Sequence, residues 1–370
     1  MTTEPPSLLD RVLAASAVGT RERSVDPDLV AAIVRDEFGL AGTLQRIATE
    51  KDDTFVLGRA GGAEGRQLVK VSSSYEDPLT VDLQSVALDH AAAHDPTLPL
   101  PRLRRARHGA TMIAVGGGCG PHPRLLRVLS YLEGEPIGQR TPTPDQARLL
   151  GSSLARLSLA LRGLEHRGAD RLLIWDLQNL AQLRPLLTYV DRPELRTLVE
   201  RVLDIFDGDV APLLPSAEHQ VLHDDFNRFN VLVDGAAPQY VTGIIDFGDV
   251  TRTAVALDLA VAAGSFLTAQ EDPWRDVLAL VDGYLEVRPL TDAELDIVAG
   301  AAPARVALRV LVTAYQRATD PERAAYLHSH GHDDLARLRA LARIEPNGIR
   351  HRLQRLMERH RTVLRRNEPQ

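Results

Sequence analysis

Cysteine is almost absent from this sequence, since Cys119 is the single one among 370 residues. One cysteine excludes an intramolecular disulfide framework and favours a reducing compartment. Long apolar runs are also missing, because no uninterrupted stretch approaches the roughly 18 residues that span a bilayer. Residues 1–6 contain neither the basic nor the apolar segment of a signal peptide. We therefore expect a cytoplasmic protein with no membrane attachment.

An excess of basic charge is missing as well. The formal net charge is −7, which gives no overall electrostatic footprint for binding nucleic acid. There is no internal repeat, and no low-complexity tract beyond short glycine clusters. Hydrophobic residues make up 44% and charged residues 25% of the chain, as in an ordinary globular protein. A chain of this length can form two lobes with a sizeable core.

The most informative stretch is residues 221–249. Its polar segment, 223–230, lies between a short apolar segment and the β-prone run 231–233. Turn-forming residues follow, and 240–245 is a second β-branched run. The sequence therefore predicts a polar loop that leads into a β-hairpin.

Three oxygen-bearing side chains meet at the open end of this predicted hairpin. Asn230 lies just before the first strand and Asp246 just after the second, so antiparallel pairing brings them together. Asp225 lies five residues upstream of Asn230 on the same loop. Magnesium takes one or two carboxylates and completes its shell with water and substrate phosphates. We predict that Asn230 and Asp246 hold Mg²⁺.

The order of these residues matches a template of phosphoryl transfer. The pattern is His223-x-Asp225, then Asn230, then Asp246-Phe-Gly. In that template the first Asp orients the acceptor hydroxyl, while the Asn and the second Asp hold metal. Either short motif alone carries little weight, but the two in register with a hairpin between them are a strong signal. Asp224 could also be the base, and the spacing to Asn230 favours Asp225.

An upstream strand supplies a lysine. Lys70 stands between valines in the predicted strand 66–71, a pattern that is also typical of a solvent-facing edge charge. Its place after a first hairpin predicts that it binds nucleotide phosphates. In the helix predicted over 81–93, Gln84 stands where protein kinases have the Glu that holds this lysine. A glutamine can only accept a hydrogen bond from Lys70, so the lysine would be held less tightly unless another acid substitutes.

Two further segments are expected at the nucleotide. The charged turn 48–53, with Asp53 and Thr54 at its end, would cover the phosphates, although without a glycine it also resembles any charged hairpin turn. Ser130, Tyr131 and Leu132 close a later strand at the crossing between lobes. Backbone groups there would bind adenine or guanine.

Two other motifs invite a different interpretation. The glycine cluster 116–120 follows a predicted strand, as in dinucleotide-binding proteins, but another strand comes next, which predicts a hairpin turn. Histidines at 328, 330 and 332 could ligate zinc. We favour a polar interhelical loop, because the hydrolase pattern would need an Asp at position 332.

The remainder of the chain is typical of helices. Capping boxes begin at Thr143 and Thr291, each with Gln or Glu three residues later. Leucines at 150, 154, 157 and 161 form a core stripe at helical spacing. The basic segment from residue 348 onward predicts an amphipathic helix docked on the second lobe.

Together these residues resemble the aminoglycoside phosphotransferase and choline kinase superfamily, and within it the hydroxylysine kinase branch, over roughly residues 28–330. The motifs that carry the resemblance are Glu50-Lys-Asp-Asp-Thr-Phe55, Val69-Lys-Val71, Asp82-Leu-Gln84, Trp175-Asp-Leu177, the loop 223–230, Ile245-Asp-Phe-Gly-Asp249, Asp258-Leu-Ala260, Pro289-Leu-Thr291 and Tyr315-Gln-Arg317. The resemblance implies that Asp225 is the catalytic aspartate, that Asn230 and Asp246 are metal ligands, and that Lys70 binds phosphate. This sequence departs from the family at Asp224, where Gly or Asn is usual, and at Asp53-Thr54, where Gln-Asn is usual.

We therefore expect an α+β, bilobal protein-kinase-like fold. Residues 1–132 would form an N-terminal lobe with an N-terminal helix and a small antiparallel β-sheet, and 133–370 a larger, mostly helical lobe with the catalytic hairpin and the acceptor site. The expected activity is Mg²⁺-dependent transfer of the γ-phosphoryl of ATP or GTP to a hydroxyl of a small, cationic amino alcohol such as hydroxylysine. The candidate substrate-binding residues are Asp224, Asp249, Trp175 and Tyr315.

Three alternatives stay open. An aminoglycoside or peptide-antibiotic phosphotransferase would use the same catalytic residues with a different acceptor cleft. A nucleotide-binding pseudokinase would be expected to lack Asp225, Asn230, Asp246 or Lys70, all of which are present. A metal-dependent phosphohydrolase that uses His223 and Asp224 would need helices bearing further histidines, whereas these residues enter a strand.

Overall fold

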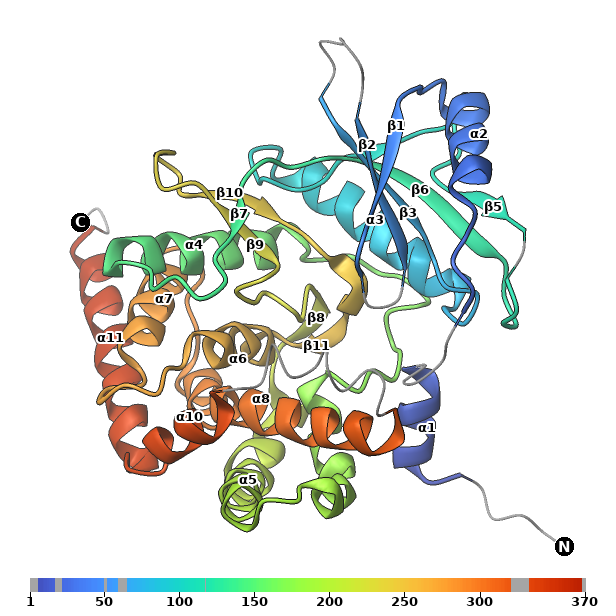
Figure 1. Cartoon of the computed structure of the whole chain (residues 1–370). Coiled ribbons are helices and arrows are strands. Elements are labelled where there is room, and N and C mark those ends of the chain that lie inside the picture. The colour runs from blue at the N-terminus through green and yellow to red at the C-terminus, as the bar shows by residue number, and fades with distance from the viewer. Residues whose placement is uncertain are drawn as a thin grey trace, which may run out of the picture.

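The computed structural model describes residues 6–16, 22–49, 52–58, 65–116, 118–320 and 333–367. An antiparallel β-sheet with two flanking helices forms the upper lobe in Figure 1, and a larger, mostly helical lobe lies below it. The predicted α+β, bilobal architecture is confirmed.

The upper lobe is built on one sheet with strand order β1-β2-β3-β6-β4, in which β5 also pairs with β6. The strands are β1 (Thr43–Ile47), β2 (Asp53–Gly58), β3 (Gln67–Val71), β4 (Leu103–Arg104), β5 (Ile113–Val115) and β6 (Arg124–Ser130). All of these pairs are antiparallel. Since β5 and β6 pair directly, the glycine-rich segment between them joins two strands of a hairpin, as predicted.

One face of the sheet is covered by α2 (Pro27–Phe38). The side chain of Asp26 caps its first turn, and Gly39 ends it with a left-handed φ of 67°. Val30, Val34 and Phe38 pack with Val69, Val71 and other buried residues of the strands. Side chains alternate along a strand, so Lys70 points to the opposite face.

The opposite face is covered by α3 (Pro78–His94), whose apolar side belongs to the core of the helical lobe. Leu83, Ala87, Leu88 and Ala91 are buried in that core and not in the core under α2. The short helix α1 (Leu8–Ala15) also packs below, because Val12 lies in the same core and the Ile174 N–H donates to the Ser16 hydroxyl at 2.9 Å. Residues 8–16 therefore associate with the helical lobe, which corrects the predicted 1–132 boundary (Figure 1).

The helical lobe contains α4 (Pro144–Ala160), η1 (Leu177–Tyr189), α5 (Pro193–Ile205), η2 (Phe206–Val210), η3 (Ala211–Ser216), α6 (Val255–Phe266), α7 (Arg275–Leu285), α8 (Asp292–Thr319), α10 (Asp334–Leu341) and α11 (Pro346–Asn367). Both predicted capping boxes are formed, at the starts of α4 and α8. The four leucines of the α4 stripe are buried. On α11, Ile349, Leu353 and Leu356 are buried as predicted.

Two small sheets carry the polar loop. The predicted hairpin consists of β9 (Val231–Val233) and β10 (Val241–Ile244), and β7 (Glu135–Pro136) adds to its edge. The second sheet, which the sequence did not reveal, pairs β8 (His219–Leu222) with β11 (Thr251–Ala254). The loop 223–230 thus leaves one small sheet and enters the other.

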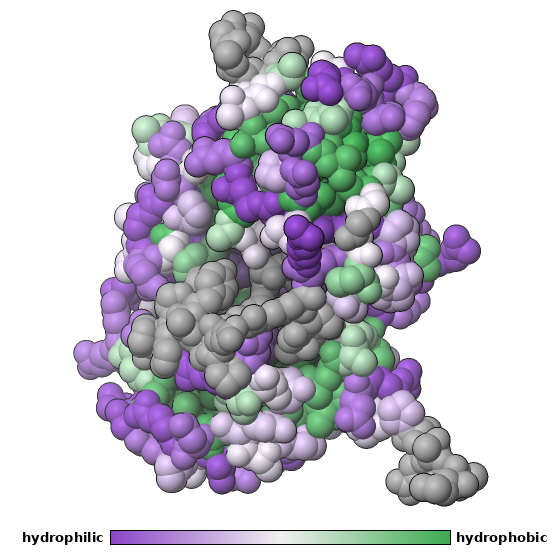
Figure 2. All heavy atoms as spheres, turned by 45° about the vertical axis from the view of Figure 1, so that its right-hand side comes forward, coloured by the Kyte–Doolittle hydropathy of each residue, from purple (hydrophilic) through white to green (hydrophobic). Residues whose placement is uncertain are grey.

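The helix α8 is long and apolar enough to cross a membrane, but 72% of its most apolar window is buried inside the protein. A buried core helix passes the same test of length and composition, so this is weak evidence for a membrane span. On the face shown in Figure 2, hydrophilic residues are spread over both lobes.

The contact between α4 and α7 leaves no room for a side chain at Gly151. A Cβ atom there would overlap the carbonyl oxygen of Leu280 on α7. We expect Gly151→Ala to lower the free energy of unfolding by about 1–3 kcal/mol or more through overpacking, measured by denaturant unfolding. Gly348→Ala is the matched control, because Gly348 also lies in a helix but has no atom within 4 Å of an added Cβ. Equal stability of the two variants would contradict this packing.

Candidate active site

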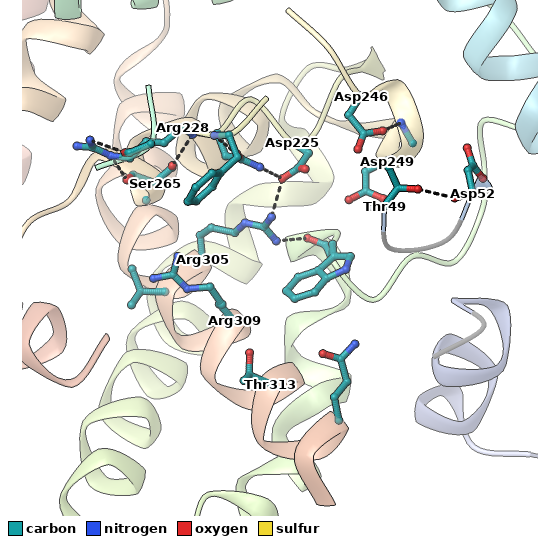
Figure 3. A pocket seen from close by; sticks show the side chains of 18 of the residues that line it. Thr49, Asp52, Asp225, Arg228, Asp246, Asp249, Ser265, Arg305, Arg309 and Thr313 are labelled. Atoms are coloured by element: carbon teal, nitrogen blue, oxygen red, sulfur yellow. Dashed lines mark hydrogen bonds and ion pairs between the residues drawn. The ribbon is translucent and has the colours of Figure 1, made fainter. Parts of the chain in front are cut away.

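A pocket of about 330 Å³ lies between the lobes. Its volume is in the range of sites for small molecules. The lining includes Thr49, Asp52, Lys70, Glu76, Gln84, Trp175, Asp225, Asn227, Arg228, Asp246, Asp249, Arg305, Arg309, Thr313, Gln316 and Arg337. Figure 3 shows that Asp246, Asp249 and Asp52 lie on one side of Asp225, and that Arg305 and Arg309 project from α8 on another.

His223 joins the polar loop to the hairpin. Its Nε2 donates to the Ile245 carbonyl at 3.1 Å, and its Nδ1 accepts from the Asp225 N–H at 3.2 Å. Burial lowers the pKa of His223, which keeps the ring neutral with one donor and one acceptor nitrogen. The ring also packs edge-on against Phe247 at 4.7 Å. His-x-Asp and Asp-Phe-Gly are therefore two halves of one packed unit.

Asp225 has three side-chain partners. Its Oδ1 accepts from Asn227 Nδ2 and from Arg305 Nη2, both at 2.9 Å, and its Oδ2 accepts from Asn230 Nδ2 at 2.6 Å. Burial raises the pKa of Asp225 to about 7, against the opposing effect of the Arg305 charge. A carboxylate that titrates near neutrality is suited to accept a proton from an alcohol.

The hairpin brings Asn230 and Asp246 together as predicted from their spacing. The Ile245 N–H donates to the Asn230 carbonyl at 2.9 Å. The Asn230 amide nitrogen faces Asp225, which leaves Oδ1 as the atom that could hold a metal. Asp246 has a left-handed φ of 60°, and its carboxylate lines the pocket. These hard oxygen donors fit Mg²⁺.

No group of three or more His, Cys, Asp or Glu that could hold a metal occurs among the described residues. A site with one carboxylate and one carboxamide agrees with that finding, since Mg²⁺ takes its other ligands from water and phosphates. The histidines at 328, 330 and 332 lie outside the described residues.

Lys70 points into the pocket between two carboxylates. Its Nζ lies 3.2 Å from Asp52 Oδ2 and 3.8 Å from Asp246 Oδ1. Burial alone would lower the pKa of Lys70, but these two carboxylates outweigh it and raise the pKa. The additional acid left open by the sequence is therefore Asp52.

Gln84 lines the pocket but has a partner other than the predicted Lys70. Its Oε1 accepts from Arg127 Nη2 at 2.8 Å. Arg127 lies beside Lys70 in the register of β3 and β6, so both side chains emerge on the α3 face. The prediction that Gln84 holds Lys70 is wrong, because the longer guanidinium of Arg127 reaches Gln84 instead.

The predicted phosphate contacts of Asp53 and Thr54 are also corrected, because neither side chain lines the pocket. Asp53 Oδ2 accepts from Arg124 Nη2 at 2.6 Å and from the Val25 N–H at 2.8 Å, and its Oδ1 pairs with Arg46. Thr54 is buried at 2% exposure. Asp52 and Thr49 of the same turn line the pocket instead, while Glu50 and Lys51 lie outside the described residues.

In the segment that crosses between the lobes, two of the backbone N–H groups predicted to bind the nucleotide base donate to carbonyls of the protein instead. The Ser130 N–H donates to the Arg102 carbonyl at 2.8 Å, and the Tyr131 N–H donates to the Arg66 carbonyl at 3.1 Å. No hydrogen bond joins the Leu132 N–H to another described residue. Of the three predicted residues, Leu132 thus has a backbone N–H that no other described residue accepts.

The structure does not support the prediction that Asp224 binds substrate, because its side chain lies outside the pocket. It has 0% exposure, it is absent from the pocket lining, and its φ of 56° explains why Gly or Asn suits this position. Its N–H donates to Asp258 Oδ1 at 2.8 Å, while neither carboxylate oxygen has a partner among the described residues. Burial, together with the charges of Asp176 and Asp258, raises the pKa of Asp224 well above its ordinary value. The extra acid next to Asp225 therefore lies outside the pocket, where burial favours the protonated form of its carboxyl.

The other three substrate candidates differ in position. Asp249 lines the pocket with Arg171 Nη2 at 3.9 Å, and the ring of Trp175 lies 5.0 Å from the Arg305 guanidinium. Tyr315 does not line the pocket, since its ring packs edge-on against Tyr189 at 5.3 Å. The pocket is lined by its neighbour Gln316 instead of the predicted Tyr315.

The sequence analysis did not predict that one face of α8 lines the pocket. Arg305, Arg309, Thr313 and Gln316 line the pocket at spacings of four, four and three residues. These spacings place them on one side of a helix. Polar residues that recur at helical spacing within an otherwise apolar helix could have indicated this face from the sequence alone. Arg337 of α10 joins them at the same wall.

Comparison with known proteins agrees with this geometry. Residues 43–294 match the phosphotransferase enzyme family, abbreviated APH. The chain belongs to this family.

Three similar proteins illustrate the relationship. Hydroxylysine kinase from Mus musculus is 26% identical over 315 residues, which cover 80% of this chain and 84% of the relative. The solved structure of a microcompartment-associated aminopropanol kinase has a TM-score of 0.59 at 19% identity and covers 84% of this chain and 95% of its own. That of amicoumacin kinase has a TM-score of 0.60 at 13% identity and covers 84% and 93%. These structural neighbours share the fold of this phosphotransferase.

Replacing the buried carboxyl of Asp224 by a neutral amide should stabilise the protein at high pH. The folded-state pKa lies above the ordinary 3.8, so the folded protein keeps a proton that the unfolded chain releases. Its contribution to stability is therefore lost as pH rises above about 4. Asp224→Asn tolerates the left-handed φ and should raise Tm relative to the parent by on the order of 2 °C more at pH 8 than at pH 5.

Calorimetry at the two pH values measures this difference. Asp36→Asn is the control, because the side chain of Asp36 is 66% exposed. The same Tm increment at both pH values would contradict a buried, protonated Asp224.

Proposed function

We propose that this phosphotransferase is a small-molecule kinase that transfers the γ-phosphoryl of ATP or GTP to a hydroxyl of an amino alcohol of the hydroxylysine type. The observation that carries the proposal is the placement of Asp225, Asp246 and Lys70 around one pocket. The relative of Mus musculus named above supports the acceptor class. A cytoplasmic location is part of the same proposal.

Asp225 acts as the base in this reaction. The acceptor hydroxyl oxygen forms a bond to the γ-phosphorus while the bond from that phosphorus to the β–γ bridging oxygen breaks. The hydroxyl proton moves to Asp225, and the nucleoside diphosphate leaves. Arg305 and Asn230 hold the carboxylate of Asp225 in place through one hydrogen bond each to its two oxygens.

Lys70 binds the phosphate oxygens that do not react. Since it is paired with Asp52 and Asp246 beforehand, it is charged and pointed into the pocket. Mg²⁺, when bound by Asp246 and Asn230, would neutralise charge on the phosphates. The amicoumacin kinase structure contains AMP-PNP and Ca²⁺, which supports a nucleotide and a divalent cation in this fold.

Asp249 is the proposed partner of an acceptor ammonium. It lines the pocket near Asp225, and its charge is one cause of the raised pKa of Asp225. Asp249→Ala should therefore raise the acceptor KM, and an unchanged KM would exclude this role.

Aminoglycoside phosphotransfer is the second candidate. Asp52, Glu76, Asp246 and Asp249 give one end of the pocket an acidic character that a polycationic acceptor could use. The catalytic residues would be unchanged.

The proposal is tested by screening purified enzyme with amino alcohols and aminoglycosides, each with ATP and with GTP. Nucleoside diphosphate release that depends on the acceptor is the expected result. Asp225→Asn should lower kcat by about 10²–10⁴-fold through loss of the base, with nucleotide affinity retained. Acceptor-dependent turnover that survives in Asp225→Asn would contradict the assignment.

The rate should also depend on pH through Asp225. Because its pKa is about 7 and the base must be unprotonated, kcat/KM should rise with pH to a plateau with a midpoint near 7. Arg305→Gln removes a cation that lowers this pKa, so the midpoint should move to higher pH. Arg305→Lys is the control that keeps the charge. An identical midpoint in Arg305→Gln would contradict the role of the ion pair.

A further inference from the structure

The two ends of the pocket carry opposite charge. Asp52, Glu76, Asp246 and Asp249 lie toward Lys70, the end at which the proposed function places the nucleotide and metal. Beyond Asp225 the lining changes to Arg228, Arg305, Arg309 and Arg337. Figure 3 shows this division, with Asp246 and Asp249 on one side of Asp225 and Arg228, Arg305 and Arg309 on the other sides.

Among the described residues, the basic end of the pocket has fewer carboxylates than guanidinium groups. Arg309 donates to Asp334 through Nε at 3.1 Å and through Nη2, and Arg337 Nη1 lies 3.7 Å from the same carboxylate. Asp334 is buried at 5% exposure and is shared by both arginines. The charge of Asp333 also acts on Arg337, so among the described residues two carboxylates face these two arginines.

Arg228 adds a third cation to this wall. Its guanidinium donates to backbone carbonyls, to Ser265 at 3.0 Å and to Arg140 at 2.7 Å, which satisfy hydrogen bonds without supplying charge. Asp276, whose charge acts to raise the pKa of Arg228, also pairs with Arg275 Nε at 3.1 Å. Burial and the charge of Arg337 both lower the pKa of Arg228, a sign of cations that repel one another.

Arg309 and Arg337, at the basic end of the pocket, also have guanidinium N–H groups without a partner among the described residues. Among the described residues, Arg309 contacts Asp334 through Nε and Nη2, and its Nη1 has no partner there and could reach a ligand. The side chain of Arg337 is only 14% exposed, and its one ion pair with a described residue is the long contact of 3.7 Å to Asp334. Mostly buried cations are costly without an anion, and guanidinium groups match a carboxylate in geometry.

We propose that the acceptor carries a carboxylate, which Arg309 and Arg337 bind while its hydroxyl lies at Asp225. This inference rests on the proposed kinase function and narrows its acceptor to a hydroxy amino acid. Arg305, which contacts Asp225, and Arg309 are one helical turn apart on α8, or about 6 Å along the axis. That spacing favours a hydroxyl and a carboxylate separated by four or five bonds, as in homoserine or hydroxylysine.

The test compares acceptors that differ only in the carboxylate. The pairs are hydroxylysine with 1,5-diaminopentan-2-ol, homoserine with 3-aminopropan-1-ol, and threonine with 1-aminopropan-2-ol, with kanamycin as a polycation that lacks an anionic group. We expect at least a tenfold higher kcat/KM for the carboxylate member of the best pair. In Arg309→Gln and Arg337→Gln that ratio should fall at least tenfold. Arg105→Gln, on the distant upper lobe, should keep the ratio of the parent.

Calorimetric binding of hydroxylysine and 1,5-diaminopentan-2-ol in the presence of AMP-PNP gives a readout that needs no turnover. If no acceptor is phosphorylated but hydroxylysine binds at least tenfold more tightly, the kinase function fails and the carboxylate site stands. If 3-aminopropan-1-ol, 1-aminopropan-2-ol or kanamycin is the best acceptor, the carboxylate site fails and the kinase function stands. Equal loss on both members of a pair in Arg309→Gln would also overturn the inference.

Discussion

The neutral imidazole of His223 is the contact on which the active site depends. One nitrogen donates to the carbonyl before Asp246 and the other accepts from the amide of Asp225, so one ring sets the distance between these two aspartates. Protonation would replace the acceptor nitrogen with a donor and break the second contact. Burial prevents that by lowering the pKa of the ring. Asp225 and Asp246 are therefore positioned before any substrate arrives.

The Asp225–Arg305 pair stands where the acidic and basic halves of the pocket meet. An acidic half suits a cation bound to phosphates, and a basic half suits an anionic group on the acceptor. A cation in the basic half, or an anion without a bound cation in the acidic half, would meet charge of its own sign. We propose that this division of charge orients the two substrates in a cavity of about 330 Å³.

Local patterns in the sequence were sufficient for the hairpin, the capping boxes and the strand of Lys70, because each depends on neighbouring residues. These patterns failed to predict which side chain enters the site where that depends on the exact conformation of a turn or on a partner distant in the sequence. Asp52 and Asp53 are adjacent, and only the folded turn determines which carboxylate faces Lys70. The partner of Gln84 comes from β6, 43 residues away. Asp224 is buried because its backbone adopts a left-handed conformation, which the spacing of residues in the sequence does not predict.

The attachment of α3 limits how the protein could be recombined with its relatives. Its buried leucines belong to the lower core, whereas the sheet beside it has a separate core under α2. A chimera that exchanged the whole upper lobe would replace one side of the lower core and expose mismatched apolar surface. Leaving α3 in place would not avoid this mismatch, because Leu129 of β6 belongs to the same lower core, and Leu68 of β3 and Leu103 of β4 pack against it.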